Sequence, residues 1–290
     1  MKRAVKYCLG IVIISAVTAG ALPSLDVEVR RHLPDGRELV HASQGAFGPA
    51  ADGIVMLYRE EGCADCRYEG RALVPGKGGL YRAVPLPAIR QFDNLTVQND
   101  GIGSVLFVDA DGDGRNEVLV LVKGLRRGPG GYPLACVAVL GWDGASFRAL
   151  AAYENYFGES CDSAAQVRAM TGLLAGVRGS YVSETAGVSA DMTITLSENG
   201  SITGTWNAVY GAAHMCDRLT FTVRQSGGTT ELVRWSDGAG AEVVMGTMRV
   251  SGKGATVRFI RDPGEFDCGA GHPAVVKLVR APSGLRPPPP

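Results

Sequence analysis

The stretch Asp191–Ala208, DMTITLSENGSITGTWNA, decides the fold of the second half of the chain. From Met192 to Leu196, apolar side chains alternate with threonines, which is typical of a β-strand with one buried face. The Asn199-Gly200 pair then lies between two such runs, and this dipeptide favours a tight hairpin turn because both residues tolerate positive φ. The stretch therefore predicts an antiparallel β-hairpin.

The same pattern continues from residue 178 to the end of the folded chain, with turn signals between the runs. The predicted strands are Gly179–Ser183, Asp191–Ser197, Ser201–Ala208, Arg218–Gln225, Glu231–Ser236, Glu242–Val250, Thr256–Arg261 and Ala274–Arg280. Eight sequential strands with one apolar face favour an up-and-down antiparallel barrel, because closure removes both unpaired edges. In pattern, this half resembles the small lipocalin-like barrels of exported bacterial proteins.

The first half predicts a mixed β-domain with less regular strands. A hairpin is expected over Leu25–His41, and further strands over Ile54–Arg59, Arg67–Val74, Gly79–Val84, Leu134–Leu140 and Ser146–Tyr153. Helical periodicity is convincing only over Asp162–Leu174, where Ser163 and Gln166 have the spacing of a capping box. The predicted fold class is all-β with two domains: a leader over 1–21, an N-terminal β-domain over 22–160, a linker helix over 161–176, the barrel over 177–281 and a proline-rich tail over 282–290.

The acidic stretch DADGDGRNE, residues 109–117, carries the clearest chemical signal in the chain. Asp109, Asp111 and Asp113 stand at alternate positions on one short loop between two strand-like runs. Carboxylates at this density repel one another unless a hard cation lies between them, and such oxygen donors suit Ca²⁺. An EF-hand would need a glutamate where Val120 stands and helices on both sides. A solvated Asp/Gly turn between two strands is the structural alternative.

The acidic stretch also resembles the calcium loop of FG-GAP/VCBS (integrin-like) repeats, over residues 103–124. The resemblance implies a calcium site with carboxylate ligands from Asp109, Asp111 and Asp113, the backbone carbonyl of Arg115, and the carboxylate of Glu117. Glu117 stands where that family usually has aspartate.

The N-terminus predicts export. Lys2, Arg3 and Lys6 precede the apolar run Cys8–Val17, and small residues end at Ala21, as in a cleaved signal peptide. We therefore expect a periplasmic or secreted protein without a membrane span after cleavage. Its net charge would be −3, which argues against nucleic acid as the main partner.

Six cysteines remain once the leader is removed, an even number that favours disulfides in an oxidising compartment. Proximity in the chain favours the pairs Cys63–Cys66, Cys136–Cys161 and Cys216–Cys268. Two alternatives stay open: a redox site at Cys63 and Cys66, and a zinc site in which His214 and His272 join Cys216 and Cys268.

The sequence contains no nucleophile elbow, zinc-protease motif or phosphate-binding glycine loop. The acids Glu154, Glu159 and Asp162 leave a carbohydrate-active hydrolase open as an alternative. The leading expectation is an exported calcium-binding β protein with a non-catalytic binding or envelope-structural role, whose partner is a protein, a glycan or a small apolar ligand. A barrel that binds a small apolar ligand, or that inhibits a hydrolase, is the second expectation.

Overall fold

The computed structural model describes residues 25–281, apart from 49, 64–67, 90–94, 97–100, 112, 127–132, 159–160, 212–213, 237–240, 252–253 and 262–271. The predicted leader and the proline-rich tail lie outside the described residues. Within them the chain is mostly β, with two open sheets followed by a closed eight-stranded antiparallel barrel. No helix in this described part is long and apolar enough to cross a membrane.

The first sheet is an antiparallel meander, in the order β1-β2-β3-β4. Its strands are β1 (Arg37–Phe47), β2 (Ala50–Glu60), β3 (Glu69–Pro75) and β4 (Tyr81–Pro85), with the short 3₁₀ helix η1 (Lys77–Gly79) before β4. Helix α1 (Leu25–His32) covers one face, where Val29 packs with Ile54, Met56 and Leu73.

The second sheet has β7 (Glu117–Arg126) at its centre. The other strands are β5 (Leu95–Thr96), β6 (Ile102–Val108), β8 (Pro133–Trp142) and β9 (Phe147–Ala149). Both faces of β7 are buried: Val118, Val120 and Val122 pack toward the first sheet, whereas Leu119 and Leu121 pack toward the helices and the barrel. Because both faces are buried, the sequence of β7 is a continuous apolar run from Val118 to Val122 and does not alternate with polar residues.

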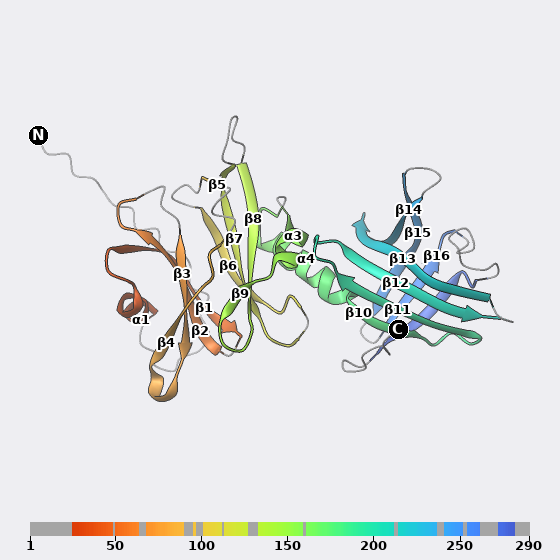
Figure 1. Ribbon diagram of the computed structural model, residues 1–290, viewed down its shortest axis with the longest axis horizontal. Coiled ribbons are helices and arrows are strands. Elements are labelled where there is room, and N and C mark those ends of the chain that lie inside the picture. The colour runs from red at the N-terminus through yellow and green to blue at the C-terminus, as the bar shows by residue number, and fades with distance from the viewer. Residues whose placement is uncertain are drawn as a thin grey trace, which may run out of the picture.

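Two helices connect the second sheet to the barrel, namely α3 (Ala151–Phe157) and α4 (Ala164–Val177). Figure 1 shows both helices between the sheet and the barrel. Tyr153, Phe157, Val167 and Leu174 belong to one buried cluster that reaches from the second sheet into the barrel. The helices therefore form part of a continuous core, and the predicted division into two domains stays a prediction.

The barrel closes through pairing of its first and last strands. Its strands are β10 (Gly179–Ser183), β11 (Val188–Leu196), β12 (Ile202–Tyr210), β13 (His214–Ser226), β14 (Thr229–Ser236), β15 (Ala241–Ser251), β16 (Gly254–Phe259) and β17 (Val275–Arg280). Large side chains fill the interior, where a Cβ on Gly204 would lie 2.3 Å from the Phe221 ring. The predicted eight-stranded barrel is confirmed.

Two of the strands predicted in the first half differ from the structure. The strand predicted at the start of the hairpin over Leu25–His41 is wrong, because residues 25–32 form α1. Acidic residues lie in the first turn of this helix and basic residues in its last turn, which complements the helix dipole. The predicted strand Ser146–Tyr153 is also wrong beyond Ala149, because Tyr153 and Phe157 lie four residues apart and bury one face of α3.

The predicted helix over Asp162–Leu174 is confirmed with shifted ends. It begins at Ala164, after the N-cap Ser163, whose side chain accepts a hydrogen bond from the backbone N–H of Gln166. It runs on to Val177, past the predicted end at Leu174. β2 begins at Ala50, before the predicted strand Ile54–Arg59, and pairs there with Phe47 of β1.

Candidate metal centre

The acidic loop joins two paired strands of the second sheet, β6 and β7. The last residue of β6, Val108, pairs with the first residue of β7, Glu117. Because β7 is the buried central strand, its first side chain is only 5% exposed. A carboxylate is therefore held at the edge of the core, close to the carboxylates of Asp109 and Asp111.

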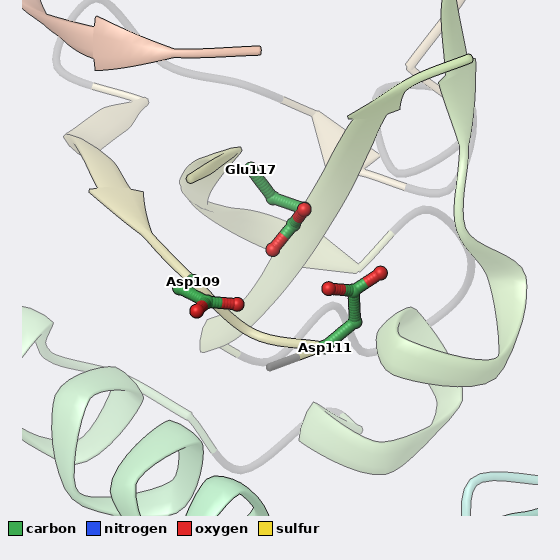
Figure 2. A group of neighbouring side chains, drawn as sticks. All are labelled: Asp109, Asp111 and Glu117. Atoms are coloured by element: carbon green, nitrogen blue, oxygen red, sulfur yellow. The ribbon is translucent and has the colours of Figure 1, made fainter. Parts of the chain in front are cut away.

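Three carboxylates converge at this point (Figure 2). One oxygen from each of Asp109, Asp111 and Glu117 lies within 4.8 Å of the others. Oxygens bound to one Ca²⁺ at about 2.4 Å lie no more than about 4.8 Å apart. The spacing of the three oxygens is therefore compatible with a single shared cation.

Backbone N–H groups hold the loop in shape. Gly114 N–H donates to Asp109 Oδ2 at 3.0 Å, and Asp113 N–H donates to Asp111 Oδ1 at 3.0 Å. Gly114 has φ +87°, which only glycine adopts without strain. Asp113 itself is exposed and accepts from Arg115 N–H at 2.7 Å. The structure thus brings together three of the five predicted ligands and leaves the Asp113 side chain outside the group; the Arg115 carbonyl stays a prediction.

Two side chains, Asn116 within the motif and Arg178 outside it, fix the loop to the rest of the molecule. The side-chain amide of Asn116 donates to Ala46 O at 3.0 Å, next to the β1–β2 connection. Arg178, which follows α4, donates through Nη1 to the backbone oxygen of Asp111 at 2.7 Å and to the Tyr153 hydroxyl at 2.6 Å. Sequence reasoning missed Arg178 and Tyr153, because no local pattern links them to a loop that lies far away in the chain.

Burial and mutual repulsion disfavour the ionised forms of Glu117 and Asp111. Burial raises the pKa of Glu117 to about 7, and repulsion from Asp111 and Asp109 contributes to the increase. The backbone N–H of Ala110 donates to Glu117 Oε2 at 2.6 Å, and this hydrogen bond lowers the pKa. Burial also raises the pKa of Asp111, while the Asp113 N–H and Arg178 lower it. A bound dication would relieve this repulsion, because an opposite charge favours the ionised carboxylates.

We expect Arg178→Ala to destabilise the protein by about 2 kcal/mol, because it leaves the Asp111 carbonyl and the Tyr153 hydroxyl without their shared donor. Urea denaturation measures this loss. Arg168→Ala, at an exposed position of α4, is the matched control and should change stability by less than about 0.5 kcal/mol. Equal stability of the two variants would show that Arg178 does not support the loop.

The structure tests the three predicted disulfide pairs to different extents, because some of their cysteines lie outside the described residues. Cys63 and Cys216 are disulfide-bonded, whereas Cys66 and Cys268 lie outside the described residues. The predicted Cys136–Cys161 pair is wrong. Cys136 packs on the side of the second sheet that faces β1–β4, whereas Cys161 has a free thiol in the core on the opposite side. Burial raises the pKa of the Cys161 thiol.

The two predicted histidines are placed differently. His214 begins β13, while His272 is buried against the rings of Tyr210 and Phe259, at centroid distances of 4.8 and 4.7 Å. His272 Nδ1 lies 2.9 Å from Pro273 O. The zinc alternative is wrong in its four-ligand form, because zinc takes thiolates and the Cys216 sulfur is in a disulfide.

The two described acids of the hydrolase alternative, Glu154 and Asp162, have different surroundings. Glu154 Oε1 accepts from the backbone N–H of Val139 at 3.3 Å, and Asp162 is exposed at the start of α4. Glu159 lies outside the described residues. The observed contact gives Glu154 a structural role, as a brace between α3 and β8.

Comparisons with protein-family models, with curated proteins and with solved structures each returned no match.

Proposed function

We propose that this chain is an exported, calcium-stabilised β protein with a non-catalytic binding or envelope-structural role. The observation that carries the proposal is the convergence of Asp109, Asp111 and Glu117 at the start of the central strand. Three oxygen donors of this kind match the preference of Ca²⁺ for hard oxygen ligands. The predicted leader and the disulfide-bonded Cys63 and Cys216 agree with the proposed oxidising compartment.

The expected role of the ion is structural. The loop lies where three parts of the molecule meet: Asn116 bonds to Ala46 of β1, Glu117 begins β7, and Arg178 connects α4 to the barrel. An ion that neutralises the carboxylates would hold the β6–β7 register and both anchors together. The Arg115 carbonyl and the Asp113 carboxylate, or water, would complete the coordination.

Metal retention tests the proposal directly. Native mass spectrometry of the exported protein in excess Ca²⁺ should show one bound ion, which the double variant Asp109→Asn/Asp111→Asn loses. Asp143→Asn is the matched control, because Asp143 is an exposed acid whose Oδ1 accepts backbone N–H bonds in a similar turn, at the β8–β9 connection. Equal calcium occupancy in both variants would exclude this loop as the site.

Without calcium, stability should fall as the pH rises. The folded protein holds the Glu117 proton with a pKa of about 7, against an ordinary value of 4.5 in the unfolded chain. The unfolded chain therefore loses the proton first, so this stabilisation is complete below pH 4.5 and is lost through pH 7. We expect a loss on the order of 2 kcal/mol after solvent screening, measured by urea denaturation in chelator. If stability in chelator did not change between pH 4.5 and pH 7, Glu117 would not have the raised pKa that this prediction requires.

A further inference from the structure

A groove of about 710 Å³ lies between α4 and the barrel. The C-terminal half of α4 forms one wall, with Gly172, Leu173 and Gly176. The opposite wall comes from the β13–β14 connection and from the ends of β15 and β16 that lie beside it. The volume falls in the range of small-molecule sites, about 300–1,000 Å³.

One part of the groove is apolar. Leu173 and Val250 are half-buried there, next to the buried Met248 and Val177. Gly172 adds open space, because a Cβ built on it meets no atom within 4 Å. These residues provide a short hydrocarbon surface that a flexible apolar chain could cover.

The other part of the groove is cationic. Arg249 of β15 and Arg258 of β16 are both exposed and line it. Arg249 pairs with Thr256, and Arg258 pairs with Thr247, so the two arginines are diagonal neighbours on one face of the barrel. Diagonal neighbours lie about 7 Å apart, within common reach of one small anionic group for long side chains. The hydroxyl groups of Thr247 and Thr256 stand beside them as further donors.

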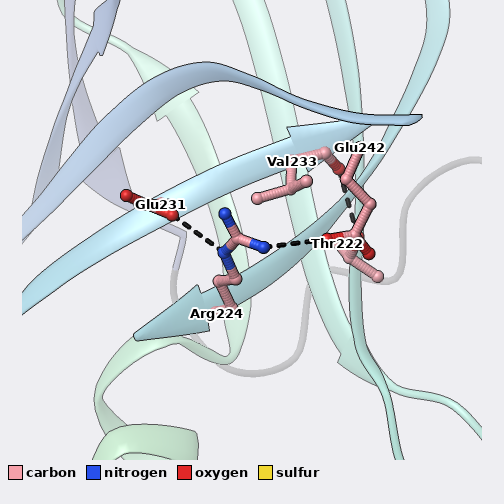
Figure 3. Close-up of polar contacts among 5 residues, drawn as sticks. All are labelled: Thr222, Arg224, Glu231, Val233 and Glu242. Carbon is pink, nitrogen blue, oxygen red and sulfur yellow. Dashed lines mark hydrogen bonds and ion pairs between the residues drawn. The ribbon is translucent and has the colours of Figure 1, made fainter. Parts of the chain in front are cut away.

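No acidic residue lines this groove in the described part of the chain. On the described strand next to β15, the acid Glu231 is opposite Thr247. Its carboxylate is engaged by Arg224 Nε at 2.8 Å, and a second nitrogen of Arg224 bonds Glu242 at 2.8 Å (Figure 3). Among the described residues, neither Arg249 nor Arg258 has an ion-pair partner, so both guanidinium groups are available to an external anion.

We propose that this groove binds a single-chain amphiphile with an oxyanion head group, a carboxylate or a phosphate monoester. Arg249 and Arg258 bind the head group through charge-assisted hydrogen bonds, for which the planar guanidinium is well suited. The hydrocarbon chain lies along Leu173 and Val250, over the surface left open by Gly172. This site is separate from the acidic loop and does not depend on calcium.

Calorimetric titration of the full chain tests the proposal with three matched ten-carbon probes: decanoate, decyl phosphate and the uncharged decyl glucoside. The anionic probes should bind saturably with one site, and the better of the two identifies the head group. Decyl glucoside, acetate and inorganic phosphate should each bind at least about tenfold more weakly, because each lacks either the charge or the chain.

Two variants separate the head-group site from the chain site. Arg249→Gln/Arg258→Gln should weaken anion binding by about tenfold or more, whereas Arg82→Gln, an exposed arginine on β4, should leave it unchanged. Gly172→Leu should block binding of both anions while raising the helix propensity of α4, so a retained melting temperature shows that the fold is intact. Equal binding of decyl glucoside, or full binding by either groove variant, would overturn the proposal.

Discussion

Glu117→Gln is expected to have opposite effects on stability with and without calcium. In chelator at pH 8 the variant should melt above the wild type, because it replaces a buried carboxylate that Asp109 and Asp111 repel. The amide oxygen can still accept the hydrogen bond from the Ala110 N–H. Removing the unfavourable charge therefore stabilises the metal-free protein.

With Ca²⁺ at about 100 times its dissociation constant, the wild type should gain about 2.7 kcal/mol by mass action. For a chain of this size the gain corresponds to a rise in Tm of about 5–10 °C. Glu117→Gln should gain much less, because it has lost one of three convergent carboxylates. The order of the two melting temperatures should therefore invert when calcium is added. If both proteins shifted equally, Glu117 would not be a ligand.

Asp113→Asn separates the family resemblance from the observed geometry. The resemblance implies that Asp113 is a ligand, whereas its side chain lies outside the group formed by Asp109, Asp111 and Glu117. A calcium response like that of the wild type would support a site of three carboxylates. A loss equal to that of Glu117→Gln would show that the loop rearranges when the ion binds.

Trp206 should give the largest loss of stability in the barrel. Its side chain is 1% exposed and packs against Phe259 at a centroid distance of 5.4 Å. Trp206→Ala should cost about 4 kcal/mol through lost burial and the cavity that remains, which lowers Tm by about 10 °C. Thermal and urea denaturation both measure this change.

Trp206→Phe should cost far less, within about 1 kcal/mol. The indole Nε1 is buried without a hydrogen-bond partner among the described residues, so the wild type already bears the cost of an unsatisfied donor. Removing that donor offsets much of the lost ring volume. A cost for Trp206→Phe close to that of Trp206→Ala would mean that the indole N–H is satisfied in the folded protein.

The barrel could be predicted because its signals are local. The hairpin over Asp191–Ala208 has alternating side chains and a turn dipeptide, and the structure pairs Met192 with Trp206, as the alternation of apolar side chains predicts. Helix α1 was missed because the alternation of Val27 and Val29 is too short to distinguish a strand from a helix. The buried position of Val29 against the first sheet, which favours the helix, depends on tertiary contacts.

The candidate site also has a part that local sequence predicts and a part that depends on tertiary packing. Asp109, Asp111 and Glu117 belong to one short motif, so their proximity follows from the hairpin that joins β6 to β7. Arg178 and Tyr153 reach the loop only through the packing of α3 and α4. The pairing of Cys136 with Cys161 failed because proximity in the chain says nothing about which side of a sheet each residue occupies.

Calorimetric titration of the chelator-treated, full-length protein with Ca²⁺ at pH 8 tests the central claim most directly. We expect a saturable heat for one ion per chain, which Asp109→Asn/Asp111→Asn abolishes and Asp143→Asn preserves. The absence of any saturable heat from a folded protein that mass analysis shows to be free of metal would contradict the account.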